Sequence, residues 1–218
     1  MAIAEPFRMI WDTLKVWWEA WTGLWLLGLV WVLCWMTLVL GPPATFGFFY
    51  SVRWLIAEGD INWKHFYRMT IKHILVSWLW FLACLLVLFL AYSNYVFYNS
   101  LANGVGSFLR VLALVVGFLW TVVQFYALPY YVLLEKKSLW IAWKNSLFTI
   151  LASPIFSLVL WVVLAALLFL HLAIFPIFLA GPGLVVLLAS MAVENRIQKF
   201  GIRERNTNET VNSANQES

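Results

Sequence analysis

Charged residues are scarce in this 218-residue sequence. Aspartate, glutamate, lysine and arginine make up 11% of the chain, whereas hydrophobic residues make up 64%. Soluble domains carry about 25% charged residues. A soluble chain of this size could not remove so many apolar side chains from water. The composition therefore excludes a soluble globular domain and predicts an integral membrane protein.

Four long segments lack acidic and basic residues altogether: 20–52, 73–109, 111–134 and 145–193. One bilayer crossing takes roughly 20 apolar residues, and a backbone in hydrocarbon must satisfy its own hydrogen bonds. The short alternating segments typical of a membrane β-barrel do not occur. We therefore predict an all-α, polytopic transmembrane helical bundle, with six spans preferred and five as the alternative. The predicted spans are residues 23–40, 44–58, 74–95, 111–131, 154–171 and 176–192.

Residues associated with catalysis or metal binding are also missing. Both cysteines, Cys34 and Cys84, fall inside apolar runs, which excludes a disulfide framework and a metal site. The sequence has no HExxH, GxSxG, Walker or CxxC motif, and no carboxylate lies in the middle of a predicted span. His65 and His73 stand beside lysines, and we expect both to be solvated. We predict a non-enzymatic protein without cofactor, metal or catalytic residues.

The two ends of the chain differ in character from the middle. Residues 1–22 predict an amphipathic interfacial helix, because charged residues alternate with a broad apolar face. That face consists of Phe7, Ile10, Trp11, Leu14, Trp17, Trp18 and Trp21. Residues 23–196 form the predicted transmembrane domain. Residues 197–218 contain too few apolar side chains to fold and predict a disordered cytoplasmic tail.

The distribution of basic residues predicts the orientation. With six spans, every lysine and arginine except Arg110 lies on one side, and the five-span alternative is less asymmetric. Both place the C-terminus in the cytoplasm, and the six-span version also places the N-terminus there. The cytoplasmic basic patch is Lys64, Arg68, Lys72, Lys136, Lys137 and Lys144. We expect it to attract anionic lipid headgroups at the bilayer surface. Nucleic acid is a poor partner, because the net charge is only +4.

Glycine and proline interrupt two apolar stretches, which end at Arg53 and Glu194. Paired interruptions of this kind indicate a binding site in repeat-built transporters, although they also simply shape turns and kinks. We expect Gly41-Pro42-Pro43 to end one helix and turn the chain. Arg53 either reaches the headgroups or holds an anion or a carboxylate, and Gln124 hydrogen-bonds another helix. The candidate ligand or partner contacts are Gly41, Pro42, Pro43, Thr45, Arg53, Gln124, Gly181, Pro182 and Gly183.

The segment PATFGFFYSVR at 43–53, followed by WKHFYR at 63–68, resembles the YesL-like family of bacterial integral membrane proteins, a family of unknown function. The broader similarity covers residues 7–200. The resemblance implies a bacterial plasma-membrane protein. Family members are often encoded beside carbohydrate importers, which implies a non-enzymatic accessory or scaffold in carbohydrate uptake with a sugar importer as partner. The alternative is a small membrane carrier or lipid-handling protein with a site at the broken helices.

Overall fold

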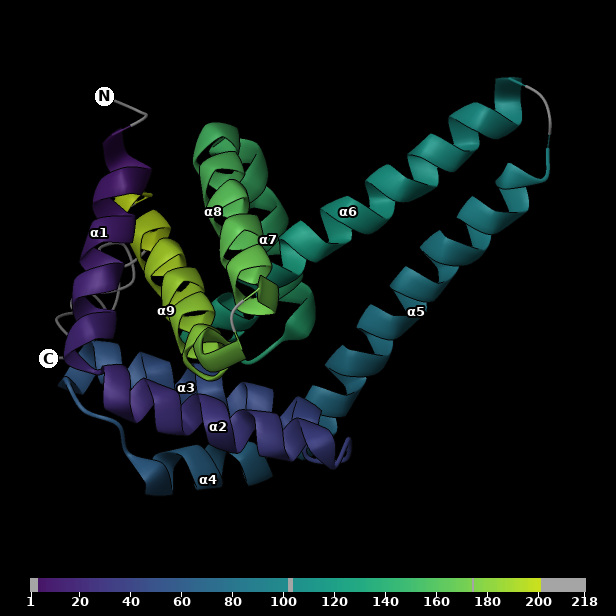
Figure 1. The fold of residues 1–218 in the computed structure, drawn as a ribbon. Helices are drawn as coiled ribbons and strands as arrows, with labels where there is room; N and C mark the ends of the chain where they lie inside the picture. The colour runs from purple at the N-terminus through teal and green to yellow at the C-terminus, as the bar shows by residue number, and fades with distance from the viewer. Residues whose placement is uncertain (1–3, 102–103, 174, 201–218) are drawn as a thin grey trace, which may run out of the picture.

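The computed structural model describes residues 4–101, 104–173 and 175–200, and every regular element in these ranges is a helix (Figure 1). The predicted all-α class is therefore confirmed. The helices are α1 (Ala4–Glu19), α2 (Trp21–Met36), α3 (Gly41–Glu58), α4 (Trp63–Lys72), α5 (Ile74–Asn99), α6 (Gly104–Leu133), α7 (Leu139–Ala152), α8 (Pro154–Ala173) and α9 (Phe175–Lys199).

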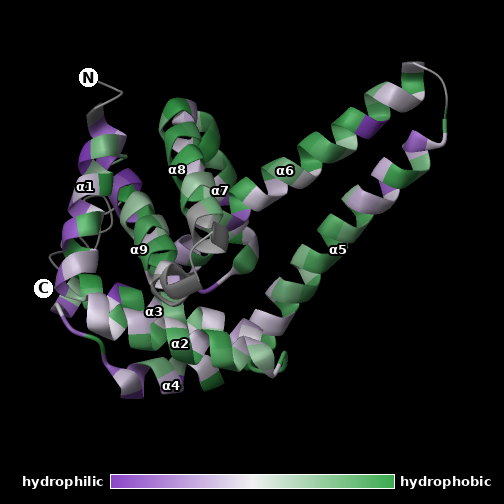
Figure 2. Ribbon diagram, viewed as in Figure 1, coloured by the Kyte–Doolittle hydropathy of each residue, from purple (hydrophilic) through white to green (hydrophobic). Residues whose placement is uncertain are grey.

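Helices α5 and α6 form a long hairpin that projects from the rest of the protein (Figure 1). They contain 26 and 30 residues, so they extend about 39 and 45 Å, more than the roughly 30 Å of hydrocarbon in a bilayer. Most of their length is apolar (Figure 2). Only 11% of the most apolar stretch of α5 is buried inside the protein. The hairpin therefore has the length and surface of a pair of membrane-spanning helices.

Small residues let the two arms of the hairpin approach each other. A Cβ atom added to Gly117 of α6 would lie 3.2 Å from the Cβ of Ala91 on α5. Apolar attraction between helices is weak in lipid, so close contact at small residues contributes much of their association. Gly117 and Ala91 therefore help to hold the arms together.

The described part of the chain has fewer candidate spans than the sequence predicts. Helices α5 and α6 each suffice alone, and two more crossings follow only if each of two bent pairs is one broken span. The α1–α2 pair bends by 86° and the α7–α8 pair by 105°. The total is two to four, against six predicted or five in the alternative. Helix α2 has 16 residues, about 24 Å, and α3 carries Arg53 within its second half.

The turn between α2 and α3 lies just before the position predicted for it. Residues 37–40 make the turn, and Leu38 has a φ of 57°. Gly41-Pro42-Pro43 then starts α3 instead of ending α2. Proline is well suited to the first turn of a helix, where its missing N–H needs no partner. At the other end, Gly59 terminates α3 with a φ of 79°, in the left-handed region that glycine adopts easily.

The core of the protein lies where α2, α3, α6 and α9 meet. Helix α9 packs against α2 and α1, and α1 and α9 run side by side (Figure 1). The first half of α3 is almost completely enclosed. The largest fully buried apolar side chains are Leu24, Leu27, Phe46, Phe48, Val52, Tyr126, Leu160, Leu187, Leu188 and Val193.

The broad apolar face predicted for α1 is split between the core and the outer surface of the protein. Ile10 and Trp17 pack against the core. Trp11 and Trp18 are 61% and 73% exposed and form an outer stripe with Phe7, Leu14 and Trp21. At the other terminus, α9 continues through Lys199, so the predicted tail begins later than residue 197. Residues 201–218 of that tail lie outside the described residues.

Candidate functional site

The charged ends of the two interrupted stretches meet in the structure. The Nη1 atom of Arg53, on α3, lies 3.0 Å from both carboxylate oxygens of Glu194, on α9. Both side chains are largely buried, with 24% and 17% of their surface exposed. Of the roles predicted for Arg53, the structure gives it the carboxylate partner. The ion pair fixes α9 against the second half of α3.

The glycine–proline breaks themselves do not meet. A Cβ atom added to Gly41 would lie 2.6 Å from the ring of Trp35, and one added to Gly183 would lie 3.0 Å from Leu24. Trp35 and Leu24 lie at opposite ends of α2, roughly 16 Å apart along its axis. Both breaks therefore pack tightly on α2 at different levels. Gly181 and Pro182 lie inside α9, and Pro42 and Pro43 are buried in the first turn of α3.

Thr45 is saturated with hydrogen bonds between α2 and α3. Its hydroxyl accepts from the indole N–H groups of Trp31 at 2.9 Å and Trp35 at 3.1 Å, and donates to the Gly41 carbonyl at 3.0 Å. An indole N–H enclosed by protein needs such an acceptor. Thr45 therefore joins two helices and keeps no hydrogen-bonding capacity for a ligand.

Gln124 joins three helices at the root of the hairpin. Its Oε1 atom accepts from the Nε1–H of Trp80 on α5 at 2.9 Å and from that of Trp143 on α7 at 3.2 Å. The sequence predicts a hydrogen bond from Gln124 to another helix, and the structure shows two. Side-chain hydrogen bonds of this kind stabilise membrane helices by about 0.6–1.7 kcal/mol each.

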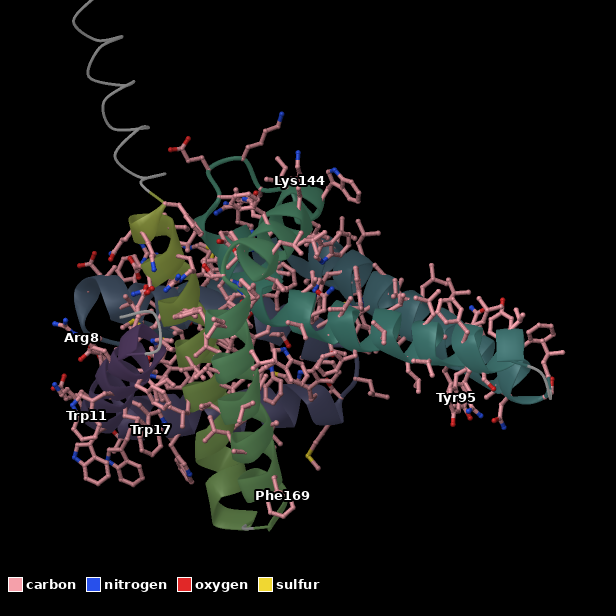
Figure 3. All side chains as sticks on the ribbon, turned by 90° about the horizontal axis from the view of Figure 1, so that it is seen from above. Arg8, Trp11, Trp17, Tyr95, Lys144 and Phe169 are labelled. Atoms are coloured by element: carbon pink, nitrogen blue, oxygen red, sulfur yellow. The ribbon has the colours of Figure 1, made fainter. Side chains whose placement is uncertain are left out.

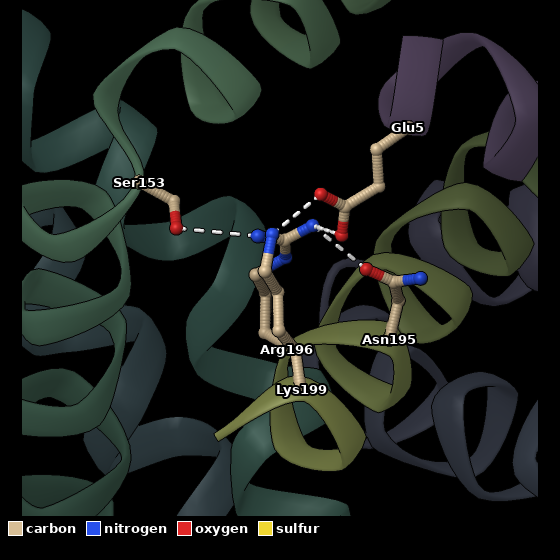
Figure 4. Close-up of polar contacts among 5 residues, drawn as sticks. All are labelled: Glu5, Ser153, Asn195, Arg196 and Lys199. Carbon is tan, nitrogen blue, oxygen red and sulfur yellow. Dashed lines mark hydrogen bonds and ion pairs between the residues drawn. The ribbon is translucent and has the colours of Figure 1, made fainter. Parts of the chain in front are cut away.

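A buried arginine on α9 was not singled out from the sequence. Arg196 is 1% exposed and forms an ion pair with Glu5 of α1 (Figure 4). Its guanidinium also donates to the hydroxyl of Ser153 at 3.2 Å and lies 3.7 Å from the ring centroid of Phe156. Arg196 therefore links α1, the α7–α8 junction and α9.

Lys199 adds a second cation to the Glu5 carboxylate, at 2.5 Å (Figure 4). Burial alone would raise the pKa of Glu5, but its contacts with Lys199 and Arg196 outweigh burial and lower the pKa. The carboxylate is therefore held in its charged form. Glu5 lies in the first turn of α1, and Arg196 and Lys199 lie in the last turn of α9. The sequence by itself gives no reason to pair these two helix ends.

Histidine, tyrosine and lysine side chains from α3 and from the segments that flank the hairpin gather at its base. His73, between α4 and α5, is 6% exposed, so the expectation that it is solvated is wrong. Its Nδ1 lies 3.0 Å from the Met69 carbonyl, and its Nε2 lies 3.2 Å from the Tyr50 hydroxyl. A neutral ring that donates from Nδ1 and accepts at Nε2 satisfies both contacts. The rings of His73 and Tyr50 stack at 4.8 Å.

Two members of the predicted cytoplasmic basic patch, Lys72 and Lys137, lie at this base. The Lys137 ammonium donates to the Val132 carbonyl at 2.7 Å and lies 5.5 Å from the Tyr50 ring centroid. Burial and the nearby charge of Lys72 lower the pKa of Lys137. Burial also lowers the pKa of His73, the Met69 hydrogen bond opposes this, and both lysines lower it further. Lys72 and Lys137 therefore lie close enough to repel each other.

The other members of the basic patch are exposed, as Lys72 and Lys137 are. Lys64, Arg68, Lys136 and Lys144 are exposed, and Lys144 extends away from the body in Figure 3. Trp63, Tyr67 and Ile71 of α4, between 42% and 68% exposed, lie among the first of these. The outer side of α4 therefore offers aromatic and cationic groups together, a combination suited to an anionic membrane surface.

No group of three or more histidine, cysteine or acidic side chains that could hold a metal ion occurs within the residues that the structure describes. Comparison with protein-family models, with curated proteins and with solved structures finds no match for this chain. The resemblance to the YesL-like family therefore stays a prediction, and its distinctive motif lies at residues 43–53 and 63–68.

Proposed function

We infer that this chain is a non-enzymatic integral membrane protein of the bacterial plasma membrane that serves as a scaffold for a membrane-embedded partner. The observation that carries the proposal is the α5–α6 hairpin, because its length suits the bilayer and most of its apolar stretch is not covered by the protein, with 11% of that stretch buried in α5 and 39% in α6. Gln124 joins α6 to α5 through Trp80 and anchors the hairpin on α7 through Trp143.

The orientation follows from the ends of the hairpin. Lys72, Lys136 and Lys137 lie at its base, whereas Arg110 lies near its tip and donates to Asn99 at 2.7 Å. The positive-inside rule then puts the base, the body and both termini on the cytoplasmic side. Tyr95 marks the opposite end of the hairpin, where it would reach the outer headgroups (Figure 3).

Cysteine accessibility tests this placement. In a chain with Cys34 and Cys84 replaced by alanine, Ser100→Cys marks the tip of the hairpin and Lys136→Cys marks its base. A membrane-impermeant maleimide added to intact cells should label Ser100→Cys and should label Lys136→Cys only after lysis. Labelling of Lys136→Cys in intact cells would contradict the orientation, and extraction of the protein by alkaline carbonate would contradict the membrane assignment itself.

One face of α5 suggests how a partner docks. Five apolar residues recur at helical spacing and are between 55% and 85% exposed: Leu75, Leu79, Leu82, Leu86 and Phe89. This spacing gives a continuous stripe on which a second transmembrane helix can pack. The resemblance to the YesL-like family makes the membrane subunit of a sugar importer the proposed partner.

Co-purification tests the partner. In mild detergent, the protein should bring down importer subunits identified by mass spectrometry, and the double variant Leu79→Ala/Leu86→Ala should recover less of them. The matched control is Leu112→Ala/Val116→Ala, which removes exposed side chains from α6. Recovery of the protein alone, together with sugar uptake that is unchanged on deletion, would count against the scaffold.

The alternative from the sequence, a carrier or lipid-handling protein with a site at the broken helices, has weaker geometric support. Its two glycine–proline breaks pack on α2 at Trp35 and Leu24, roughly 16 Å apart. Flux of sugars or lipids in proteoliposomes that falls on Arg53→Ala or Gln124→Ala would favour the carrier instead.

A further inference from the structure

We propose that Lys72 and Lys137 together bind the phosphate group of an anionic phospholipid at the base of the α5–α6 hairpin. This site deepens the proposed function and rests on it, because it requires the base of the hairpin to lie at the membrane surface. It is narrower than general attraction of the basic patch to lipid, because it assigns one headgroup to two of the six basic residues.

The two lysines approach each other because the hairpin brings its ends together. Lys72 is the last residue of α4, directly before α5, and Lys137 follows the end of α6. Helices α5 and α6 pack along their length, so the segments that flank them share one corner of the protein. Two cations that are distant in sequence therefore face the same small region.

Tyr50 fixes both sides of that region. Its hydroxyl bonds the Nε2 of His73 at 3.2 Å, and its ring lies under the Lys137 ammonium with 5.5 Å from Nζ to the centroid. The buried His73 ring, stacked on Tyr50 and bonded to Met69, holds the backbone next to Lys72. The corner is therefore ordered before any ligand arrives, which lowers the entropic cost of binding.

The charges in this corner are not neutralised by the protein. Within the described residues, no carboxylate oxygen lies within 4.0 Å of either ammonium, since the ion pairs found there involve Lys15, Arg53, Arg196 and Lys199. The Lys137 ammonium spends one of its three donors on Val132. Burial and, after it, the charge of Lys72 lower the pKa of Lys137, so keeping both ammonium groups charged has a cost in free energy. An anion placed between the two ammonium groups would offset that cost.

The position of the corner favours a lipid phosphate over a soluble one. Ile74 and Leu75, the first residues of α5, are 37% and 85% exposed and lie directly beside Lys72. A phosphate held by the lysines would thus place its acyl chains along an apolar helix surface. Basic residues at the cytoplasmic exit of membrane helices recognise lipid headgroups in this way.

A matched pair of double variants tests the site. Lys72→Gln/Lys137→Gln removes the two ammonium groups of the proposed site, and Lys64→Gln/Lys136→Gln removes two other exposed ones from α4 and from the loop after α6. Native mass spectrometry of the detergent-purified protein should detect retained phosphatidylglycerol in the wild type and in the control. The first double variant should bind it about 10- to 30-fold more weakly, the effect expected for two basic residues at the membrane surface.

The conservative variant Lys72→Arg/Lys137→Arg should retain the lipid, which separates lost charge from lost folding. Equal retention by the two glutamine variants would overturn the site, as would equal retention of phosphatidylcholine and phosphatidylglycerol. Displacement of the lipid by millimolar inorganic phosphate would assign the site to a soluble anion and overturn the lipid assignment. If Lys136→Cys stays protected in intact cells while the glutamine variants bind equally, only this site fails and the proposed orientation stands.

Discussion

Arg53 and Glu194 are 141 residues apart in the sequence, yet the Nη1 atom of Arg53 lies 3.0 Å from both oxygens of the Glu194 carboxylate. Each residue ends an apolar stretch that begins at a glycine–proline pair, one in α3 and the other in α9. The contact therefore aligns two helices that the chain connects only through five others. Because both side chains are partly buried, each charge is stabilised by the opposite charge of its partner.

Arg53→Ala should lower the free energy of unfolding by about 1–3 kcal/mol, because it leaves the Glu194 carboxylate partly buried without this cation. Thermal unfolding in detergent measures the effect, at about 2–4 °C per kcal/mol for a chain of this length. The exchanged pair Arg53→Glu/Glu194→Arg should recover part of the loss. Additive losses in the exchanged pair would contradict a direct interaction.

Gln124→Leu should also destabilise the protein, by about 1–3 kcal/mol for two indole donors. The indoles of Trp80 and Trp143 both donate to Gln124, so the substitution leaves two enclosed N–H groups without an acceptor. Thr121→Val is the control, because that hydroxyl bonds only the Phe118 carbonyl of its own helix. Its effect should stay within about 0.5 kcal/mol. Equal shifts in the midpoint of thermal unfolding for the two variants would rule out Gln124 as an interhelical link.

The sequence predicts the helices of this protein better than their arrangement. Hydrocarbon permits few backbone structures, so apolar composition alone leads to helices, and the spans predicted at 74–95 and 111–131 lie within α5 and α6. The turn after α2 was misplaced, because Pro42 and Pro43 are as compatible with a helix start as with a helix end. The number of spans was overestimated, because apolar content does not distinguish a helix that faces lipid from one packed inside the protein.

The candidate contacts depend on packing that no local pattern encodes. Arg53 and Gln124 each stand in an apolar stretch of the sequence, which indicates that each needs a partner. The partners, Glu194 and the two indoles, are brought to them by the tertiary fold. Arg196 has the same ordinary setting in sequence as Lys199, a basic residue near a helix end. Glu5 bonds both of them, but only Arg196 also lies against Ser153 and Phe156, and these contacts of the tertiary fold bury it.

Gly47→Ala should destabilise the contact between α3 and α4. A Cβ atom at Gly47 would lie 2.1 Å from the Thr70 hydroxyl and 3.1 Å from the Phe66 carbonyl oxygen, and overpacking of this kind costs about 1–3 kcal/mol. Adding Thr70→Ala removes the closest atom and should restore part of the stability. Gly104→Ala is the control, since nothing lies within 4 Å of its added Cβ. Comparable melting temperatures for the Gly47 and Gly104 variants would show that α3 and α4 are not this close.

Glu5 should make stability depend on pH. Its pKa is lowered in the folded protein from 4.5, so its contribution to stability is present above that value and is lost as the pH falls through the lower, folded-state pKa. At neutral pH, Glu5→Gln should cost about 3 kcal/mol, because it leaves the 1%-exposed Arg196 without a carboxylate. Lys199→Gln, at a side chain that is 52% exposed, should cost no more than about 1 kcal/mol.

Thermal unfolding recorded from neutral to strongly acidic pH isolates the contribution of Glu5 to the free energy of unfolding. That contribution is the difference between the wild type and Glu5→Gln. That difference should be largest at neutral pH and should shrink below pH 4.5, where the wild-type carboxylate begins to take up a proton in the unfolded chain. Other carboxylates titrate in both proteins and cancel in the difference. A difference that stays constant down to strongly acidic pH would mean that the Glu5 charge does not hold α1 on Arg196, and that shape alone joins the two terminal helices.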